Sequence, residues 1–183
     1  WSRLFGVFSG PSRDNWALSG GNRKTYLMAA ARLESFAGPG WAVGPSANLK
    51  LAMRCWEQVR KRLTSLGEGL GEKIIHHDPG SVYASYRWRE EILLEDNMRV
   101  SYSESGAKGN PWIDLLGSDE GFWSVSRITE ASSLPALRTV FDERFICYNQ
   151  DRRHSSIGQI PPREHLGQTL DTLESEPQIA AAS

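Results

Sequence analysis

Several features that define common protein classes are scarce in this sequence. Only two cysteines, Cys55 and Cys147, occur in 183 residues, which excludes a disulfide framework and a cysteine-rich zinc site and fits a reducing cytoplasm. No apolar run approaches the roughly 18–20 residues that span a bilayer, so we predict no membrane segment and no membrane partner. The chain begins at Trp1 without a methionine or a signal-peptide pattern, and we expect it to be a piece of a longer protein.

An excess of charge of one sign is also missing. The 21 basic and 22 acidic side chains give a net charge of −1, whereas proteins that rely on phosphate contacts usually carry excess basic charge. Residues 171–183 hold three of the acids and no base, which leaves 21 basic and 19 acidic side chains in the other 170 residues. The main body is therefore mildly basic, and we expect residues 167–183 to form a polar, disordered tail.

The length and the spacing of apolar residues predict one α/β domain. A chain of 183 residues suits a single domain, and 39% apolar residues are typical of a globular one. The helical spacing of Leu49, Met53 and Trp56 predicts a helix over 47–64, with Ser46 as its N-cap. Similar patterns predict strands over 26–33, 41–43, 73–77 and 99–102, and helices over 82–96, from 111 and over 134–150. This order indicates a mixed sheet with a layer of helices over it.

Three acidic residues stand at the ends of predicted elements. Asp14 precedes the first pair of strands, Asp78 follows the strand over 73–77, and Asp114 lies in the first turns of the helix that Pro111 opens. Carboxylates at such positions can converge on Mg²⁺, which prefers oxygen ligands. Two ions about 3.5–4 Å apart activate an attacking oxygen and stabilise a leaving one. Because the chain has 22 acids and most acids lie at the surface, the trio needs support from the strings around it.

Three strings near these acids resemble segments of insertion-sequence transposases, which share the retroviral-integrase catalytic core. HHDPGSVY, at residues 76–83, is similar to the segment around the family's second acid. GNPWI, at residues 109–113, resembles the lead-in to the third acid, and 35 residues separate Asp78 from Asp114, as is typical of the family. YNQDRRHSSIG, at residues 148–158, resembles the end of the family's core.

The resemblance covers residues 11–166 and leaves residues 1–10 as an N-terminal flank. It implies a ribonuclease-H-like α/β fold, a five-stranded mixed sheet flanked by helices. The implied reaction is attack of water or of a DNA 3′ hydroxyl on a phosphodiester, with two Mg²⁺ or Mn²⁺ ions. Asp14 and Asp78 would ligate the metal directly, and Asp114 would complete this catalytic set from its helix.

The same resemblance implies DNA as the partner, both transposon ends and target, and a homo-oligomer assembled on it. The implied DNA contacts fall on Lys108, Asn110, Arg152, Arg153 and His154. We expect a bacterial cytoplasmic protein, at the nucleoid when bound to DNA, with a DNA-binding region upstream. The alternative for Arg152 and Arg153 is a C-cap on the preceding helix. His76 and His77, just before Asp78, could suggest a zinc site. We expect polar packing instead, because neighbouring strand residues point to opposite faces and do not easily share one metal.

Several positions depart from the family's pattern. The family has Glu at the position of Asp114, and the missing methylene shortens the reach from the helix; a misplacement of about 1 Å can cost about 100-fold in rate. Glu120 lies about 9 Å further along that helix on another face, so it does not substitute. Asp119 and Glu120 would repel phosphate, and Arg32 stands in a predicted central strand. Three hypotheses stay open: an active DNA strand-transfer core, a catalytically inactive remnant with weak nucleic-acid or partner binding, and a nuclease that acts by hydrolysis alone. The two acids after Asp114 favour the second over the third.

Overall fold

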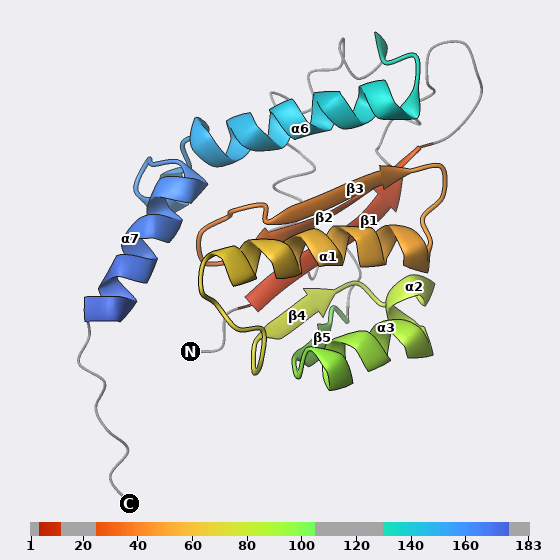
Figure 1. The fold of residues 1–183 in the computed structure, drawn as a ribbon, viewed down its shortest axis with the longest axis horizontal. Helices are drawn as coiled ribbons and strands as arrows, with labels where there is room; N and C mark the ends of the chain where they lie inside the picture. The colour runs from red at the N-terminus through yellow and green to blue at the C-terminus, as the bar shows by residue number, and fades with distance from the viewer. Residues whose placement is uncertain (1–3, 12–24, 105–129, 176–183) are drawn as a thin grey trace, which may run out of the picture.

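A five-stranded sheet forms the centre of the molecule in the computed structural model, which describes residues 4–11, 25–104 and 130–175. The strand order is β3-β2-β1-β4-β5 (Figure 1). Strands β1, β2 and β3 pair antiparallel, whereas β1, β4 and β5 pair parallel. Their bounds are β1 (Leu4–Pro11), β2 (Tyr26–Arg32), β3 (Gly40–Gly44), β4 (Ile74–His77) and β5 (Arg99–Tyr102).

Strand β1 occupies the middle of this sheet, between β2 and β4. The prediction that residues 1–10 form a flank outside the core is therefore wrong, because β1 runs over Leu4–Pro11. The eight-residue strand contains Gly6, Gly10 and Pro11, and glycine and proline are depleted in strands, so its own sequence gives a weak strand pattern. Pairing on both sides, which the sequence of one segment does not reveal, supplies the stability.

Helices cover both faces of the sheet. Strand β2 alternates, as a pleated strand must: Met28 and Ala30 pack into the cluster of helix α1 (Leu49–Ser65), and Leu27 and Ala29 into that of helix α6 (Leu134–Gln150). Figure 1 shows α1 and α6 as the two long helices beside the strands. Both were expected from their spacing. The N-cap of α1, however, is Asn48 and not Ser46, since its Oδ1 accepts from the Leu51 amide at 3.0 Å.

The segment expected to be one helix over 82–96 is broken into three pieces. These are α2 (Ser81–Ala84), α3 (Tyr86–Glu90) and the π-helix η1 (Glu91–Glu95). The break falls at Ser85, whose backbone is extended, with φ −64° and ψ 145°. The Ser85 hydroxyl donates to the Val82 carbonyl at 2.6 Å and accepts from the Trp88 amide at 3.4 Å. The Ser85 side chain thus ends α2 and begins α3. A serine hydroxyl can compete with the hydrogen bonds of the helical backbone in this way, and the spacing of apolar residues does not show it.

The C-terminal part continues into a helix where a tail was expected. After the 3₁₀ turn η3 (Ser155–Ile157), helix α7 runs over Pro162–Ser175. The predicted boundary at residue 166 falls inside this helix, and the prediction of disorder is wrong for 167–175. Leu166 is 7% exposed, so its burial anchors this helix. Within the described residues, no helix is long and apolar enough to cross a membrane.

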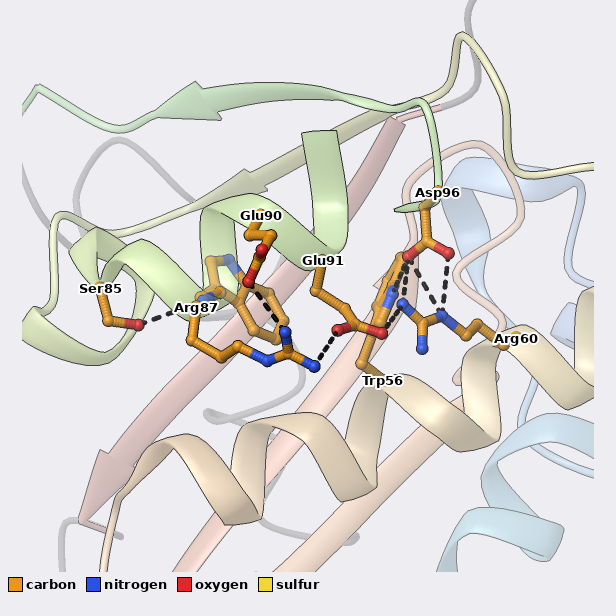
Figure 2. A network of polar contacts seen from close by, with 8 residues as sticks. Trp56, Arg60, Ser85, Arg87, Glu90, Glu91 and Asp96 are labelled. Carbon is orange, nitrogen blue, oxygen red and sulfur yellow. Dashed lines mark hydrogen bonds and ion pairs between the residues drawn. The ribbon is translucent and has the colours of Figure 1, made fainter. Parts of the chain in front are cut away.

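Two arginine-centred networks hold these layers together. Arg32, at the end of β2, is buried and binds Glu34 and Glu68 through contacts of 2.6 Å. The charge expected to be awkward in a central strand is therefore neutralised by two carboxylates from loops. Figure 2 shows the second network, in which Arg60 of α1 reaches across to Asp96 at 2.8 Å and Glu91 at 2.7 Å.

Candidate functional site

Asp78 lies directly after β4, at the carboxyl end of the middle strand of the parallel half of the sheet. His77 is level with Val7 of β1 on one side and with Tyr102 of β5 on the other. Carboxyl ends of parallel strands gather at one edge of a sheet, where open α/β folds place their ligands. The structure therefore places Asp78 at the edge where a site is expected. The side chain is half-buried, with its Oδ1 atom inaccessible to water.

The neighbouring strand β1 carries no acidic residue, its sequence being LFGVFSGP. It continues from Val7, which is level with His77, to Pro11. Those four further residues cover about 13 Å at roughly 3.3 Å per residue. Asp14 comes three residues after that strand end and lies outside the described residues.

Three other predicted site residues, Asp114, Lys108 and Asn110, also lie outside the described residues. Among the residues that are described, no three histidine, cysteine, aspartate or glutamate side chains form a group suited to a metal ion. Asp78 is the one acid of the predicted set that lies among the described residues, and its carboxylate is of the kind that Mg²⁺ takes.

The imidazole beside Asp78 sits in an aromatic enclosure. His77 is fully buried; its ring stacks on Tyr83 at a centroid distance of 4.5 Å and meets Tyr102 edge-on at 4.6 Å. Trp88 donates from Nε1 to His77 Nε2 at 3.3 Å, and His77 Nδ1 lies 3.3 Å from the carbonyl oxygen of Asp78. Desolvation lowers the pKa of His77 to about 4, with a smaller contribution in the same direction from the neighbouring His76. The ring is therefore neutral at physiological pH.

His76 faces different partners from those of His77. Its Nδ1 lies 3.0 Å from the Ser101 hydroxyl on the adjacent strand. With both nitrogens of His77 already engaged, the two rings do not present a joint pair of metal-binding nitrogens. Sequence reasoning missed the partners Trp88 and Tyr102, because Trp88 reaches His77 only after the unforeseen helix break at Ser85.

The basic string after α6 has one accessible member and two that pack inward. Arg153 is exposed. Arg152 is half-buried, with its guanidinium carbon 5.9 Å from the centre of the Tyr148 ring, and burial lowers its pKa. His154 is 6% exposed and stacks on Phe36 with ring centroids 5.3 Å apart. Burial also lowers the pKa of His154, so this residue presents little surface and little charge to a phosphate.

The class of fold follows from this arrangement. A mixed sheet with helices on both faces is the arrangement of the ribonuclease-H-like α/β fold, which this chain shares with solved structures of retroviral integrase catalytic cores. The catalytic core domain of BIV integrase matches with a TM-score of 0.59 at 15% identity, covering 95% of this chain and 99% of that chain. The catalytic core domain of HTLV-2 integrase, a dimeric form in complex with magnesium, matches with a TM-score of 0.52 at 13% identity, covering 90% and 94%.

A larger assembly contains the same fold. The match is a chain in the simian T-cell lymphotropic virus intasome in complex with PP2A regulatory subunit B56 gamma, with a TM-score of 0.63 at 10% identity. All of the present chain is covered, and it spans 57% of that chain's length. No protein-family model matches the sequence, and no curated protein matches it.

Proposed function

We propose that this chain is the catalytic core of a transposase or integrase that cleaves DNA phosphodiesters and transfers strands with divalent metal ions. The observation that carries the proposal is Asp78 at the carboxyl end of β4, in a fold shared with integrase cores. Asp14 and Asp114 would complete the ligand set for two Mg²⁺ or Mn²⁺ ions. Such ions, when bound, polarise the phosphoryl oxygen and activate the attacking oxygen. The magnesium in the HTLV-2 integrase core supports the choice of metal.

The experiment is a nicking assay on duplex DNA in Mg²⁺ and in Mn²⁺. Asp114→Glu restores the reach of the third acid without changing charge, and we expect it to raise the nicking rate roughly 10- to 100-fold. Mn²⁺ should be the more permissive ion, because Mg²⁺ demands near-ideal octahedral geometry. Asp78→Asn in the same background should abolish the activity. Activity that survives Asp78→Asn would overturn the assignment of Asp78.

DNA binding should be weak, independent of sequence and sensitive to salt, because the net charge of −1 leaves few phosphates engaged. Arg152→Ala combined with Arg153→Ala should weaken binding on all sequences alike and reduce the salt slope by up to about 2. The matched control is Arg87→Ala, which removes an exposed arginine of α3 that is already paired with Glu90 at 2.8 Å. The intasome and the dimeric core among the similar structures support a homo-oligomer on DNA. Sequence-specific binding that ignores salt would contradict this account.

The second candidate is a catalytically inactive remnant of the same fold, and the acid-free strand β1 favours it. Strand β1 lies beside β4, so an acid on it would be a near neighbour of Asp78, and the strand carries none. The two candidates differ in the nicking assay. If no variant, including Asp114→Glu, cleaves DNA in either metal while salt-dependent DNA binding persists, the remnant is the correct description.

A further inference from the structure

The hydrogen bonds around His77 are compatible with one protonation state of its ring. An indole N–H can only donate and a carbonyl oxygen can only accept. Because Trp88 Nε1 lies 3.3 Å from His77 Nε2, that nitrogen accepts and carries no proton. A neutral imidazole then has its proton on Nδ1, which lies 3.3 Å from the Asp78 carbonyl oxygen and donates to it. Both contacts fit the Nδ1–H form of the neutral ring and no other.

The ring has no freedom to adopt another orientation. Rotating it by half a turn would exchange nitrogen for carbon at both contacts and lose both hydrogen bonds. Tyr83 and Tyr102 enclose the ring, and the Tyr102 hydroxyl donates to the Tyr83 carbonyl at 3.1 Å, which ties the two enclosing residues together. Solvent, which would permit exchange between the two neutral forms, does not reach the fully buried side chain.

Trp88 is itself held independently of His77. Its ring packs edge-on against Trp56 at a centroid distance of 6.2 Å. Trp56 in turn donates from Nε1 to Asp96 at 2.7 Å (Figure 2). The backbone amide of Trp88 donates to the Ser85 hydroxyl. The donor that selects the form of His77 therefore has its place set by α1 and by the start of α3.

Hydrogen bonds from Ser103, Gly80 and His77 fix the backbone on both sides of the Asp78 α-carbon. The His77 carbonyl, on the preceding peptide, accepts from the Ser103 amide at 3.1 Å. The Asp78 carbonyl, on the following peptide, accepts from the Gly80 amide at 2.7 Å and from His77 Nδ1. Two fixed peptide planes determine the direction in which the Asp78 side chain leaves the backbone.

We propose that His77, locked as its Nδ1–H form by Trp88, is a positioning residue that orients Asp78 for metal binding. The role rests on the proposed function, in which Asp78 is a metal ligand. Groups that orient a ligand typically contribute roughly 10- to 100-fold to metal affinity. Two substitutions separate this role from simple packing. His77→Phe keeps a ring and removes the donor to Asp78, whereas His77→Asn keeps an N–H near the position of Nδ1.

The first measurement is long-range proton–nitrogen NMR of the His77 ring in the full chain at neutral pH. We expect the Nδ1–H pattern in the wild type and a shift towards the Nε2–H form in Trp88→Phe, which loses the donor and keeps an aromatic ring. A wild-type ring in the Nε2–H form, or the same pattern with and without the indole donor, would overturn the proposal. A purely packing role for Trp88 would leave the protonated nitrogen unchanged.

The second measurement is Mn²⁺ affinity by titration, on variants whose thermal unfolding confirms that they are folded. His77→Phe should weaken Mn²⁺ binding about 10-fold, and His77→Asn should recover most of that loss. Equal affinity in the wild type and both variants, while Asp78→Asn loses binding, would overturn the positioning role alone. If Asp78→Asn binds Mn²⁺ as the wild type does, the metal-site assignment itself fails, and the role of His77 fails with it.

Discussion

The two ends of the sheet hold buried polar groups in different ways. At one end, Arg32 is 1% exposed and its charge is neutralised by ion pairs with Glu34 and Glu68. At the other end, the neutral ring of His77 binds the backbone of Asp78 and leaves the half-buried carboxylate at the sheet edge. The comparison teaches that Arg32, a buried charge enclosed by its own counter-ions, is a structural lock, whereas the hydrogen bonds described around Asp78 hold its backbone.

Breaking the Arg32 network should have the largest effect on the free energy of unfolding. Arg32→Ala removes the cation and leaves two carboxylates near each other, one of them on Glu68, whose side chain is 8% exposed. We expect a loss of about 3–5 kcal/mol in the free energy of unfolding, measured by urea denaturation. Arg62→Ala, at an exposed position on α1, is the control and should change it by less than about 0.5 kcal/mol. Equal effects for the two variants would remove the distinction between a lock and an ordinary surface charge.

The second-largest effect should come from low pH, which destabilises the end of the sheet that holds His77. The pKa of His77 is lowered to about 4 in the folded protein, against about 6.5 when unfolded. Between these values the unfolded chain binds more protons, so stability rises with pH and is lost as pH falls from about 6.5 towards about 4. We expect the His77 contribution to cost about 2 kcal/mol on going from pH 7 to about pH 4.5.

The control for this loss is His77→Asn, which has no titrating group at the position. Urea unfolding at both pH values, compared between the two proteins, isolates the histidine from the other titrating groups. A wild type and a variant with the same pH dependence would show that His77 is not buried in its neutral form.

Partial exposure should make the second arginine network less costly to break. Arg60 is 25% exposed, and its partners keep other contacts when it is removed, because Asp96 also accepts from Trp56 and Glu91 also pairs with Arg87. We expect Arg60→Ala to cost about 1–2 kcal/mol, less than Arg32→Ala, with part of the loss disappearing at high salt. Denaturation at low and high salt tests both points. A larger cost at Arg60 than at Arg32 would contradict the argument from burial.

Removing the acid itself should have the smallest effect on stability. Asp78→Asn keeps the shape of the side chain, and the carbonyl contacts to Gly80 and His77 do not depend on the carboxylate. We expect a change below about 1 kcal/mol in the free energy of unfolding. The same denaturation assay measures it. A loss comparable to that of Arg32→Ala would instead make Asp78 a structural residue.

Regular periodicity predicted much of this fold. The helix over 134–150 has the predicted bounds, and the strand over 99–102 does too. Strand β1 was not predicted, because its glycines and proline obscure the strand pattern. The strand is stabilised by pairing with a neighbour on each side. The single helix expected over 82–96 was wrong because one hydroxyl, that of Ser85, competes with the backbone.

The candidate site was predictable only in part. Local strings drew attention to Asp78, and the strand register places it at the expected edge. The link from Trp88 to Asp78 through His77 was not predictable, because it depends on how three short helical pieces turn back over β4. The placements of Asp14 and Asp114 stay predictions. Strand β1 contains no acidic residue that could take the place of Asp14.

Calorimetric titration of Mn²⁺ into the full chain and into Asp78→Asn tests the central claim most directly. The claim is that the carboxyl end of β4 is a metal-binding edge on an integrase-type fold. We predict saturable binding to the wild type and a loss of at least about 10-fold in affinity in Asp78→Asn, with both proteins equally folded. Equal affinity in the two proteins, or no binding to either one or to Asp114→Glu, would contradict it.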